Sequence, residues 1–144
     1  MMVVKIMYHD EEITKLKKIP EGNWVDLRAA EEVELKAGDF HLIDLGVSMQ
    51  LPEGYEAILA PRSSTFKNYG IIQTNGFGVI DNSYCGSQDI WKMPVYATRD
   101  TVIHKDDRIA QFRIQRIQPD VFFKAVDNLD QNTTRGGFGS TGVK

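Results

Sequence analysis

Apolar and polar residues alternate along much of the chain, as they do in β-strands with one buried face. The longest such pattern covers residues 40–51, where every second residue from Leu45 to Leu51 is apolar. The apolar phase changes near Ile43, so we expect one strand with a bulge at that point. The same reasoning predicts further strands over 2–8, 24–30, 32–36, 56–60, 91–97 and 108–117.

Only one segment predicts a helix, residues 63–69, which Ser63 or Ser64 can cap and Gly70 can end. Turn signals separate the strands at intervals of about 8 to 12 residues, as in β-sandwiches. From residue 127 onward the chain is rich in Asn, Asp, Thr and Gly and has no core-forming pattern. We therefore expect an all-β, jelly-roll-like β-sandwich or distorted barrel over residues 1–126, followed by a flexible C-terminal arm over residues 127–144.

Composition narrows the class of protein. A net charge of −3 over 144 residues argues against general nucleic-acid binding, which needs a basic surface. No apolar run approaches the roughly 18 residues that span a membrane, and the N-terminus lacks signal-peptide features. The single cysteine, Cys85, fits a reducing compartment. We expect a cytoplasmic protein whose partners are neither nucleic acids nor membranes.

Residues 75–86 hold the first group of candidate site residues, with an amide at Asn75, an acid at Asp81 and an aromatic ring at Tyr84. Glycines within an extended pattern indicate a bend or a close approach of backbone to a ligand. A strand, a tight turn carrying Asp81 and a returning strand would form a slot with a buried carboxylate at its floor. The alternative is a β-hairpin with an ordinary polar turn.

Other polar groups suggest phosphate binding. Arg62, Ser63 and Ser64 stand at the start of the expected helix, where free N–H groups attract anions. A plain helix cap with a surface arginine is the alternative, and solvent-facing positions would equally explain Asp26 and Gln111. The glycine-rich end of the chain could cradle phosphate or be a disordered tail; it combines a guanidinium, an aromatic ring and two hydroxyls in Arg135, Phe138, Ser140 and Thr141.

Together these groups suggest a nucleotide site in which Asp81 orients or deprotonates a water. The three histidines stand in charged or strand contexts, and no Ser-His-Asp arrangement is indicated.

Five segments, in this order and at this spacing, resemble the motifs of the trimeric deoxyuridine triphosphatases, the dUTPases. Any one of these motifs is weak, but all five in order are a strong signal. The segments are Val25–Ala29, Pro61–Ser64, Gly78–Gly86, Asp107–Gln111 and Arg135–Gly142.

The resemblance implies Mg²⁺-dependent hydrolysis of dUTP to dUMP and pyrophosphate, with water attacking the α-phosphorus. It also implies a homotrimer whose active sites are shared between subunits. Asp81 would position the attacking water. No direct protein ligand to the metal is implied, and Asp26 would act through a metal-bound water.

The resemblance assigns the other residues to the substrate. Asn75 and the neighbouring backbone would read uracil, Tyr84 would lie under the deoxyribose, and Phe138 would stack on the base. The full set of implied substrate-binding residues is Arg62, Ser63, Ser64, Asn75, Gly78, Ile80, Tyr84, Gln111, Arg135, Phe138, Gly139, Ser140 and Thr141.

The sequence departs from the family pattern at Asn23–Val25, Lys105–Asp106 and Ser87. One rival interpretation is a dCTP deaminase, a family whose fold and motifs are similar. That family carries a catalytic glutamate shortly after the glycine of the third motif, and residues 87–91 contain no glutamate. Another is a regulatory nucleotide-binding protein without catalysis, which the presence of Asp81 disfavours.

Overall fold

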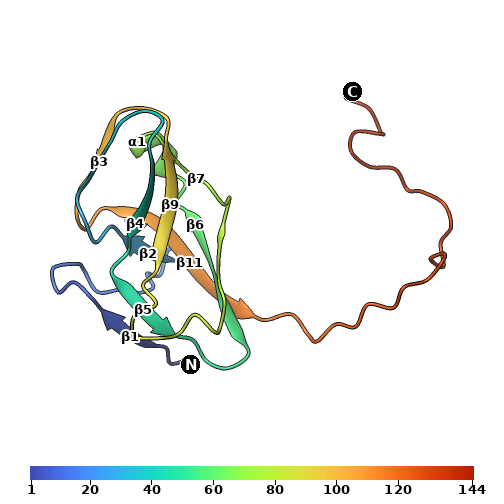
Figure 1. Ribbon diagram of the computed structural model, residues 1–144, viewed down its shortest axis with the longest axis horizontal. Coiled ribbons are helices and arrows are strands. Elements are labelled where there is room, and N and C mark those ends of the chain that lie inside the picture. The colour runs from blue at the N-terminus through green and yellow to red at the C-terminus, as the bar shows by residue number, and fades with distance from the viewer.

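Two antiparallel sheets form the body of the molecule in the computed structural model, which describes residues 1–144 (Figure 1). We call the four-stranded sheet, in the order β2-β11-β6-β8, sheet I, and the three-stranded sheet, in the order β4-β9-β7, sheet II. The strands of sheet I are β2 (Val25–Arg28), β11 (Arg108–Arg116), β6 (Tyr55–Pro61) and β8 (Gly78–Ile80). Those of sheet II are β4 (Phe40–Asp44), β9 (Lys92–Ala97) and β7 (Ile71–Gln73).

Two smaller antiparallel pairs complete the body. They are β1 (Lys5–Tyr8) with β5 (Val47–Gln50), and β10 (Thr101–Ile103) with β3 (Val33–Leu35). With a single helix of five residues, the fold is the all-β sandwich that the sequence predicts. No helix is long and apolar enough to cross a membrane.

The core lies where the alternating pattern predicts it. Met93, Val95 and Ala97 are fully buried on one side of β9, as is Trp91 directly before the strand. The indole of Trp91 meets the Phe112 ring edge-on, with 5.1 Å between ring centroids and an interplanar angle of 82°. Burial of each large apolar side chain stabilises the fold by about 1.5–3 kcal/mol. The core therefore fixes β9 and β11, and with them the strands that carry polar groups.

The prediction of one bulged strand over residues 40–51 is wrong, because β4 and β5 are separate strands that pair with different partners. The chain changes direction at Gly46, which has a φ of +70°. A Cβ there would lie 2.7 Å from the Cβ of Ala30, so only glycine fits. Ser48, expected on a polar face, is buried, and its hydroxyl contacts His9 and the carbonyl of Ser87.

The expected helix is present as α1 (Thr65–Tyr69), but serine does not cap it through its side chain. Ser64 holds the N-cap position without a side-chain hydrogen bond. Instead the buried Thr65 hydroxyl accepts a hydrogen bond from the Arg62 amide at 2.8 Å and donates to the Ile109 carbonyl at 2.9 Å. This hydroxyl ties the turn before α1 to β11 and so fixes the backbone of Arg62.

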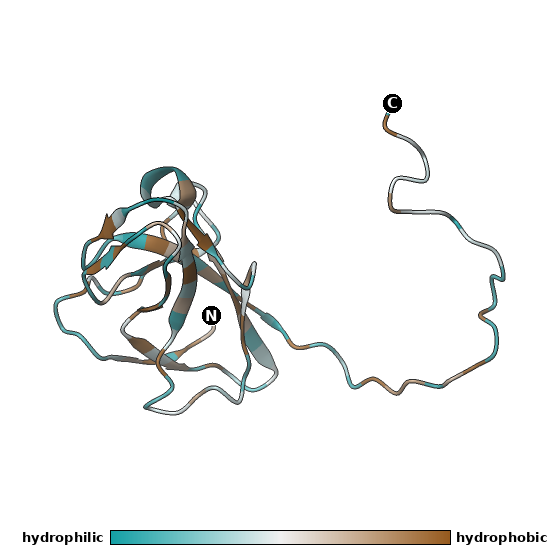
Figure 2. Cartoon of the chain, turned by 45° about the horizontal axis from the view of Figure 1, so that its top comes forward, coloured by the Kyte–Doolittle hydropathy of each residue, from teal (hydrophilic) through white to brown (hydrophobic).

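After β11 ends at Arg116, the chain forms a tail without helix or strand that leads away from the body (Figure 1). Its first part carries exposed apolar side chains, including Phe122 and Phe123. Figure 2 shows brown, hydrophobic stretches along the part of the tail next to the body.

Candidate functional site

The turn between β7 and β8 forms one side of an open pocket with a volume of about 410 Å³, which we call the amide pocket. That volume lies within the range of small-molecule sites. The pocket unites five residues that the sequence singles out, namely Asn75, Gly78, Ile80, Asp81 and Tyr84.

Neither the slot with a returning strand after Asp81 nor the alternative β-hairpin is formed over residues 75–86, since the next strand after β8 is β9, which starts at Lys92. β7 belongs to sheet II, whereas β8 pairs with β6 in sheet I, so residues 74–77 cross from one sheet to the other. Gly76 has a φ of +72°, and the Phe77 amide donates to the Asn75 carbonyl at 2.8 Å. The tight turn therefore presents Asn75 at the corner between the sheets.

Asp81 is exposed in the single chain, which corrects the expectation of a buried acid. The hydroxyl and the amide of Ser83 both donate to its Oδ1, at 2.6 and 2.8 Å. These hydrogen bonds, first from the side chain and then from the backbone, lower the pKa of Asp81 below its ordinary value. One carboxylate oxygen is thus held, while no protein group binds the other.

Tyr84 also lines the amide pocket. Its hydroxyl donates to the Ile90 carbonyl at 2.8 Å. Partial burial, with a smaller contribution from the Asp89 carboxylate, raises the pKa of Tyr84. The phenol therefore stays neutral, and its ring forms a fixed apolar wall.

A second pocket, with a volume of about 300 Å³, gathers charged groups at the other end of sheet I, and we call it the arginine pocket. Four residues that the sequence singles out line it, namely Asp26, Arg62, Ser63 and Gln111. Asp26 on β2 and Gln111 on β11 are direct cross-strand partners. The Gln111 amide donates to the Pro61 carbonyl at 3.1 Å, which fixes its orientation beside Arg62.

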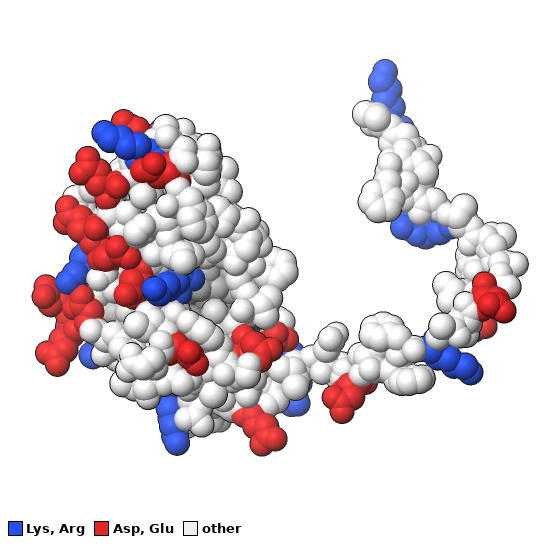
Figure 3. Space-filling model, viewed as in Figure 1, with Lys and Arg blue, Asp and Glu red and all other residues white.

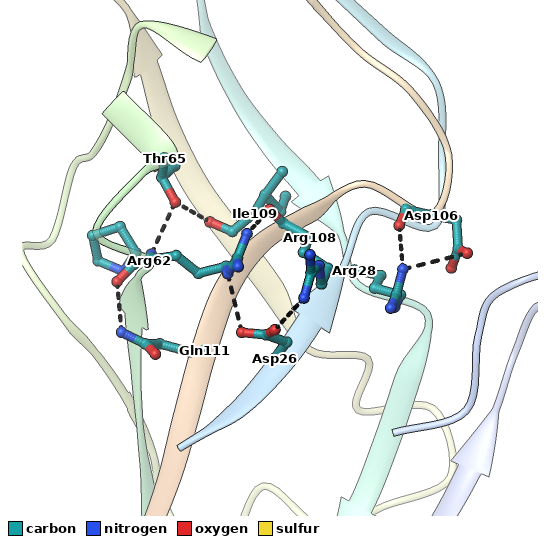
Figure 4. Close-up of polar contacts among 9 residues, drawn as sticks. Asp26, Arg28, Arg62, Thr65, Asp106, Arg108, Ile109 and Gln111 are labelled. Atoms are coloured by element: carbon teal, nitrogen blue, oxygen red, sulfur yellow. Dashed lines mark hydrogen bonds and ion pairs between the residues drawn. The ribbon is translucent and has the colours of Figure 1, made fainter. Parts of the chain in front are cut away.

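The Asp26 carboxylate lies between two guanidinium groups (Figure 4). Its Oδ1 accepts from Arg62 Nε at 3.1 Å and its Oδ2 from Arg108 Nη1 at 3.3 Å. Arg62 Nη1 also donates to the Arg108 carbonyl at 3.2 Å. Because one anion faces two cations, the cluster keeps a positive charge that suits a polyanion.

Arg108 is a site residue that sequence reasoning missed. Strict alternation would put Arg108 on the face of β11 opposite Gln111. A register shift between Arg108 and Ala110 brings its guanidinium to the side of Asp26 instead. The signal in the sequence is its place within the fourth motif, Asp107–Gln111, three residues before Gln111.

The remaining predicted residues lie in neither pocket. Ser64 stands at the start of α1 without lining the arginine pocket. The tail residues Arg135, Phe138, Gly139, Ser140 and Thr141 are exposed and remote from both pockets in this chain (Figure 1). Within the tail, the Ser140 hydroxyl accepts a hydrogen bond from the Gly137 amide at 2.7 Å.

No group of three or more His, Cys, Asp or Glu side chains in the chain could hold a metal ion. In the arginine pocket both Asp26 oxygens already face guanidinium groups.

Comparison with known proteins decides the family. The dUTPase family model matches residues 16–142. The chain belongs to the dUTPase family. A SPbeta prophage-derived deoxyuridine 5'-triphosphate nucleotidohydrolase, YosS of Bacillus subtilis (strain 168), is 57% identical over 143 residues, which cover 99% of this chain and 100% of the relative. A deoxyuridine 5'-triphosphate nucleotidohydrolase of Yarrowia lipolytica is 40% identical over 82% of this chain and 74% of that protein.

Solved dUTPase structures share the fold. A mutant dUTPase of Staphylococcus bacteriophage 80alpha, solved with dUpNHpp, has a TM-score of 0.80 at 21% identity and covers 98% of this chain and 99% of its own. The dUTPase of phage phi11 of S. aureus, described with a structural Mg(II) ion, has a TM-score of 0.76 at 18% identity over 90% and 99% of the two chains. This dUTPase is therefore a hydrolase of deoxyuridine triphosphate, as the resemblance implied.

Proposed function

We propose that this dUTPase hydrolyses dUTP to dUMP and pyrophosphate with Mg²⁺, and that Asp81 directs a water at the α-phosphorus. The observation that carries the proposal is the carboxylate of Asp81, which has one oxygen held by Ser83 and the other free at the mouth of the amide pocket. A lowered pKa keeps this group ionised at neutral pH.

The amide pocket takes the nucleoside. Asn75 and the backbone of β8 offer directional hydrogen bonds to the edge of uracil. Gly78 has no side chain and so leaves open the space beside Asn75 Nδ2, where a Cβ would lie 3.6 Å from that atom. Ile80 and the ring of Tyr84 form the apolar sides of the pocket. With its hydroxyl held by Ile90, Tyr84 cannot easily move away from a ribose 2′-hydroxyl, which favours deoxyribose.

The arginine pocket takes the phosphates. Arg62 and Ser63 lie beside Gln111, and the guanidinium of Arg108 adds further donors. Ser64 contributes from the start of α1. Charge-assisted hydrogen bonds from guanidinium to phosphate are stronger than neutral ones, so this pocket supplies the affinity for the triphosphate.

The residues present fit Mg²⁺ held mainly by the triphosphate. Mg²⁺ usually keeps several waters and binds proteins through one or two carboxylates. Both oxygens of Asp26 are engaged by arginines, which favours a contact through a metal-bound water. When bound, the ion neutralises charge on the leaving pyrophosphate.

In the reaction, the water oxygen forms a bond to the α-phosphorus while the bond from that phosphorus to the α,β-bridging oxygen breaks. Asp81 orients the water and accepts its proton. Arg62 and Gln111 stabilise the charge that passes to pyrophosphate. A positioned base and a fixed cluster of donors supply the two main contributions to catalysis here.

We further propose a homotrimer in which neighbouring chains complete each site. The two pockets share no lining residue. The amide pocket lies along β8 and Leu59 of β6, whereas the arginine pocket lies along β2, β11 and the turn that follows β6. Because the pockets are separate, a nucleoside bound in the amide pocket of one chain can have its phosphates held by the arginine pocket of another.

An exposed apolar sheet face supports self-association. Phe40, Tyr96 and Ile72 are cross-strand neighbours on the outer side of sheet II and are 60%, 45% and 48% exposed. Figure 3 shows few charged side chains on the part of the body that faces the tail. Exposed apolar patches of this kind mark protein–protein contacts.

The proposed arm, residues 127–144, closes over a site of the assembly. Phe138 stacks on uracil, and Arg135, Ser140 and Thr141 bind the γ-phosphate with the backbone of Gly139. Full exposure of Phe138 in the single chain supports this assignment, because covering an exposed aromatic ring removes apolar surface from water and is favourable in free energy.

We propose the cytoplasm as the compartment, since the exposed thiol of Cys85 suits reducing conditions.

The reaction is tested with a substrate panel in ¹⁸O-labelled water. With Mg²⁺, pyrophosphate release is expected from dUTP and not measurably from dTTP, dCTP or UTP. The label should appear in dUMP, because the water attacks the α-phosphorus. Label in pyrophosphate would overturn the attack at that atom, and equal hydrolysis of dCTP would overturn the assigned substrate.

Site sharing is tested by complementation between Asp81→Asn and Arg62→Ala. At dUTP concentrations well below KM, each variant alone is expected to show little activity, Asp81→Asn through a lower kcat and Arg62→Ala through a higher KM. After the two are refolded together in equal amounts, random assembly should restore about a quarter of the sites if each site takes the two residues from different chains. No recovery in mixed oligomers would contradict sharing, and sedimentation measures whether three chains assemble.

A further inference from the structure

Gln73 is a buried polar residue directly behind the amide pocket. It lies on β7 and is only 4% exposed. Its Nε2 donates two hydrogen bonds, one to the Leu59 carbonyl at 3.2 Å and one to Asn75 Oδ1 at 2.9 Å. Its Oε1 is buried and has no hydrogen-bond partner in the protein. The amide nitrogen alone therefore makes the contacts of this side chain.

The orientation of this pair of amides follows from chemistry. A backbone carbonyl can only accept a hydrogen bond, so the atom of Gln73 that faces Leu59 must be its nitrogen. That nitrogen is a donor, so the atom of Asn75 that faces it must be the oxygen. Turning either amide over would bring two acceptors or two donors together at about hydrogen-bond distance. One carbonyl of β6 thus determines which way Asn75 points.

The consequence is a free donor at the pocket. With Oδ1 turned toward Gln73, the Nδ2 of Asn75 is the only donor that this side chain can offer a ligand, and this atom makes no hydrogen bond within the chain. Nδ2 lies next to Gly78, 3.6 Å from where a Cβ of that residue would be. Both residues line the amide pocket.

We propose that Gln73 is a positioning residue for base selection, one that holds Asn75 with its amino group toward the base. An N–H donor matches the 4-carbonyl of uracil and opposes the 4-amino group of cytosine. Buried polar groups left unpaired by the wrong base can give discrimination of about 10⁴–10⁵. If Asn75 could turn over freely, its oxygen would accept from cytosine and much of that discrimination would be lost. The proposal rests on the proposed function in one respect, that the amide pocket takes the base.

Gln73→Glu is the decisive variant. A carboxyl group has at most one hydrogen to donate, so once Leu59 is satisfied the new side chain can only accept from Asn75. Asn75 then turns its nitrogen inward and its oxygen toward the base. We expect the ratio of kcat/KM for dUTP to that for dCTP to fall by about 100-fold or more. Product chromatography with each triphosphate measures the ratio.

Gln73→Met serves as a second variant. It removes the N–H donors of residue 73 but gives no acceptor that would turn Asn75 over, so an intermediate fall in the ratio is expected.

Ser48→Ala is the matched control, because Ser48 is 3% exposed, polar and hydrogen-bonded but does not line the amide pocket. It should leave the ratio unchanged. Thermal melting of each variant verifies the fold, and Gln73→Met keeps the test decisive if the glutamate variant does not fold.

A purely structural role would lower activity on both nucleotides and leave the ratio intact, which would overturn the proposal. In the double variant with Asn75→Ala, Gln73→Glu should change the ratio no further, because its effect passes through Asn75. A further change in that background would equally overturn it. If Asn75→Ala itself keeps the wild-type ratio, the base is not read in this pocket, and it is the proposed function that fails.

Discussion

The amide pocket and the arginine pocket belong to one sheet but are built on different physical principles. In the amide pocket, neutral groups are held by single directional hydrogen bonds, as Tyr84 is by Ile90 and Asn75 by Gln73. In the arginine pocket, Asp26 is shared between two guanidinium groups at 3.1 and 3.3 Å. Neutral directional bonds select a ligand by shape and donor pattern, whereas clustered charge holds any polyanion. Under the proposed function, we therefore expect selection of the base and affinity for the triphosphate to be separable.

The largest effect is expected from Asp81→Asn. Loss of the carboxylate that directs the water should lower kcat by about 10²–10⁴, while binding of dUTP changes little. Single-turnover kinetics measure the first and calorimetric titration the second. Asp120→Asn, an exposed aspartate beyond β11, is the control. Normal turnover in Asp81→Asn would show that another group directs the water.

Deletion of residues 134–144 should impair kcat strongly and leave the body folded, because no strand or core residue lies in that segment. Melting temperature and sedimentation of the shortened chain should match those of the full chain. Replacing only Phe138 by Ala separates stacking from phosphate contacts. A shortened chain with full activity would remove the tail from the site.

Arg62→Ala tests the arginine pocket. Loss of its charge-assisted hydrogen bonds, each worth about 1.5–3 kcal/mol, should raise KM for dUTP by about 10–100-fold. The preference for dUTP over dCTP should not change, in contrast to the variants at Gln73. Arg62→Lys keeps the positive charge but not the planar guanidinium that can bind a phosphate through two N–H groups, so KM should rise less than in Arg62→Ala. Arg116→Ala, which removes an arginine near Tyr55, is the control. A change in base preference with Arg62→Ala would show that the two pockets are not separable.

The smallest effect concerns pH. Hydrogen bonds from Ser83 lower the pKa of Asp81 below 3.8, so the carboxylate remains charged until the pH falls through that lowered value. Ser83→Ala removes the hydroxyl donor and moves the acid limb of kcat/KM toward higher pH, with little change near neutrality. Circular dichroism at each pH separates loss of activity from unfolding. An unchanged acid limb would show that Asp81 does not determine it.

The sequence predicts best where its pattern is local. One face of β9 and one face of β11 are buried as their alternation indicates, because burial of every second side chain makes every second residue of the sequence apolar. It fails over residues 40–51, where the pattern continues across Gly46 although the backbone does not. Alternation reports which side chains are buried, and it does not report which strands pair.

The candidate site shows the same division. The sequence singles out Arg62 and Asp81 within two of the five motifs, and Asn75 just before the third, because the chemistry of each is visible in the side chain itself. The roles of Arg108 and Gln73 come from partners distant in sequence, the carboxylate of Asp26 and the carbonyl of Leu59. A glutamine at the end of a short strand has no distinguishing local pattern. Such positions become visible only when the pairing of strands is known.

The hydrogen bond from Gln73 to Leu59 also joins the two layers of the sandwich, since β7 belongs to sheet II and β6 to sheet I. A slide of one layer against the other by an ångström would break it, long before the core of either layer is exposed. The rate of dCTP hydrolysis relative to dUTP hydrolysis would then report how often the two sheets slide against each other. Misreading of dCTP should rise with temperature below the melting transition, while total turnover is still increasing.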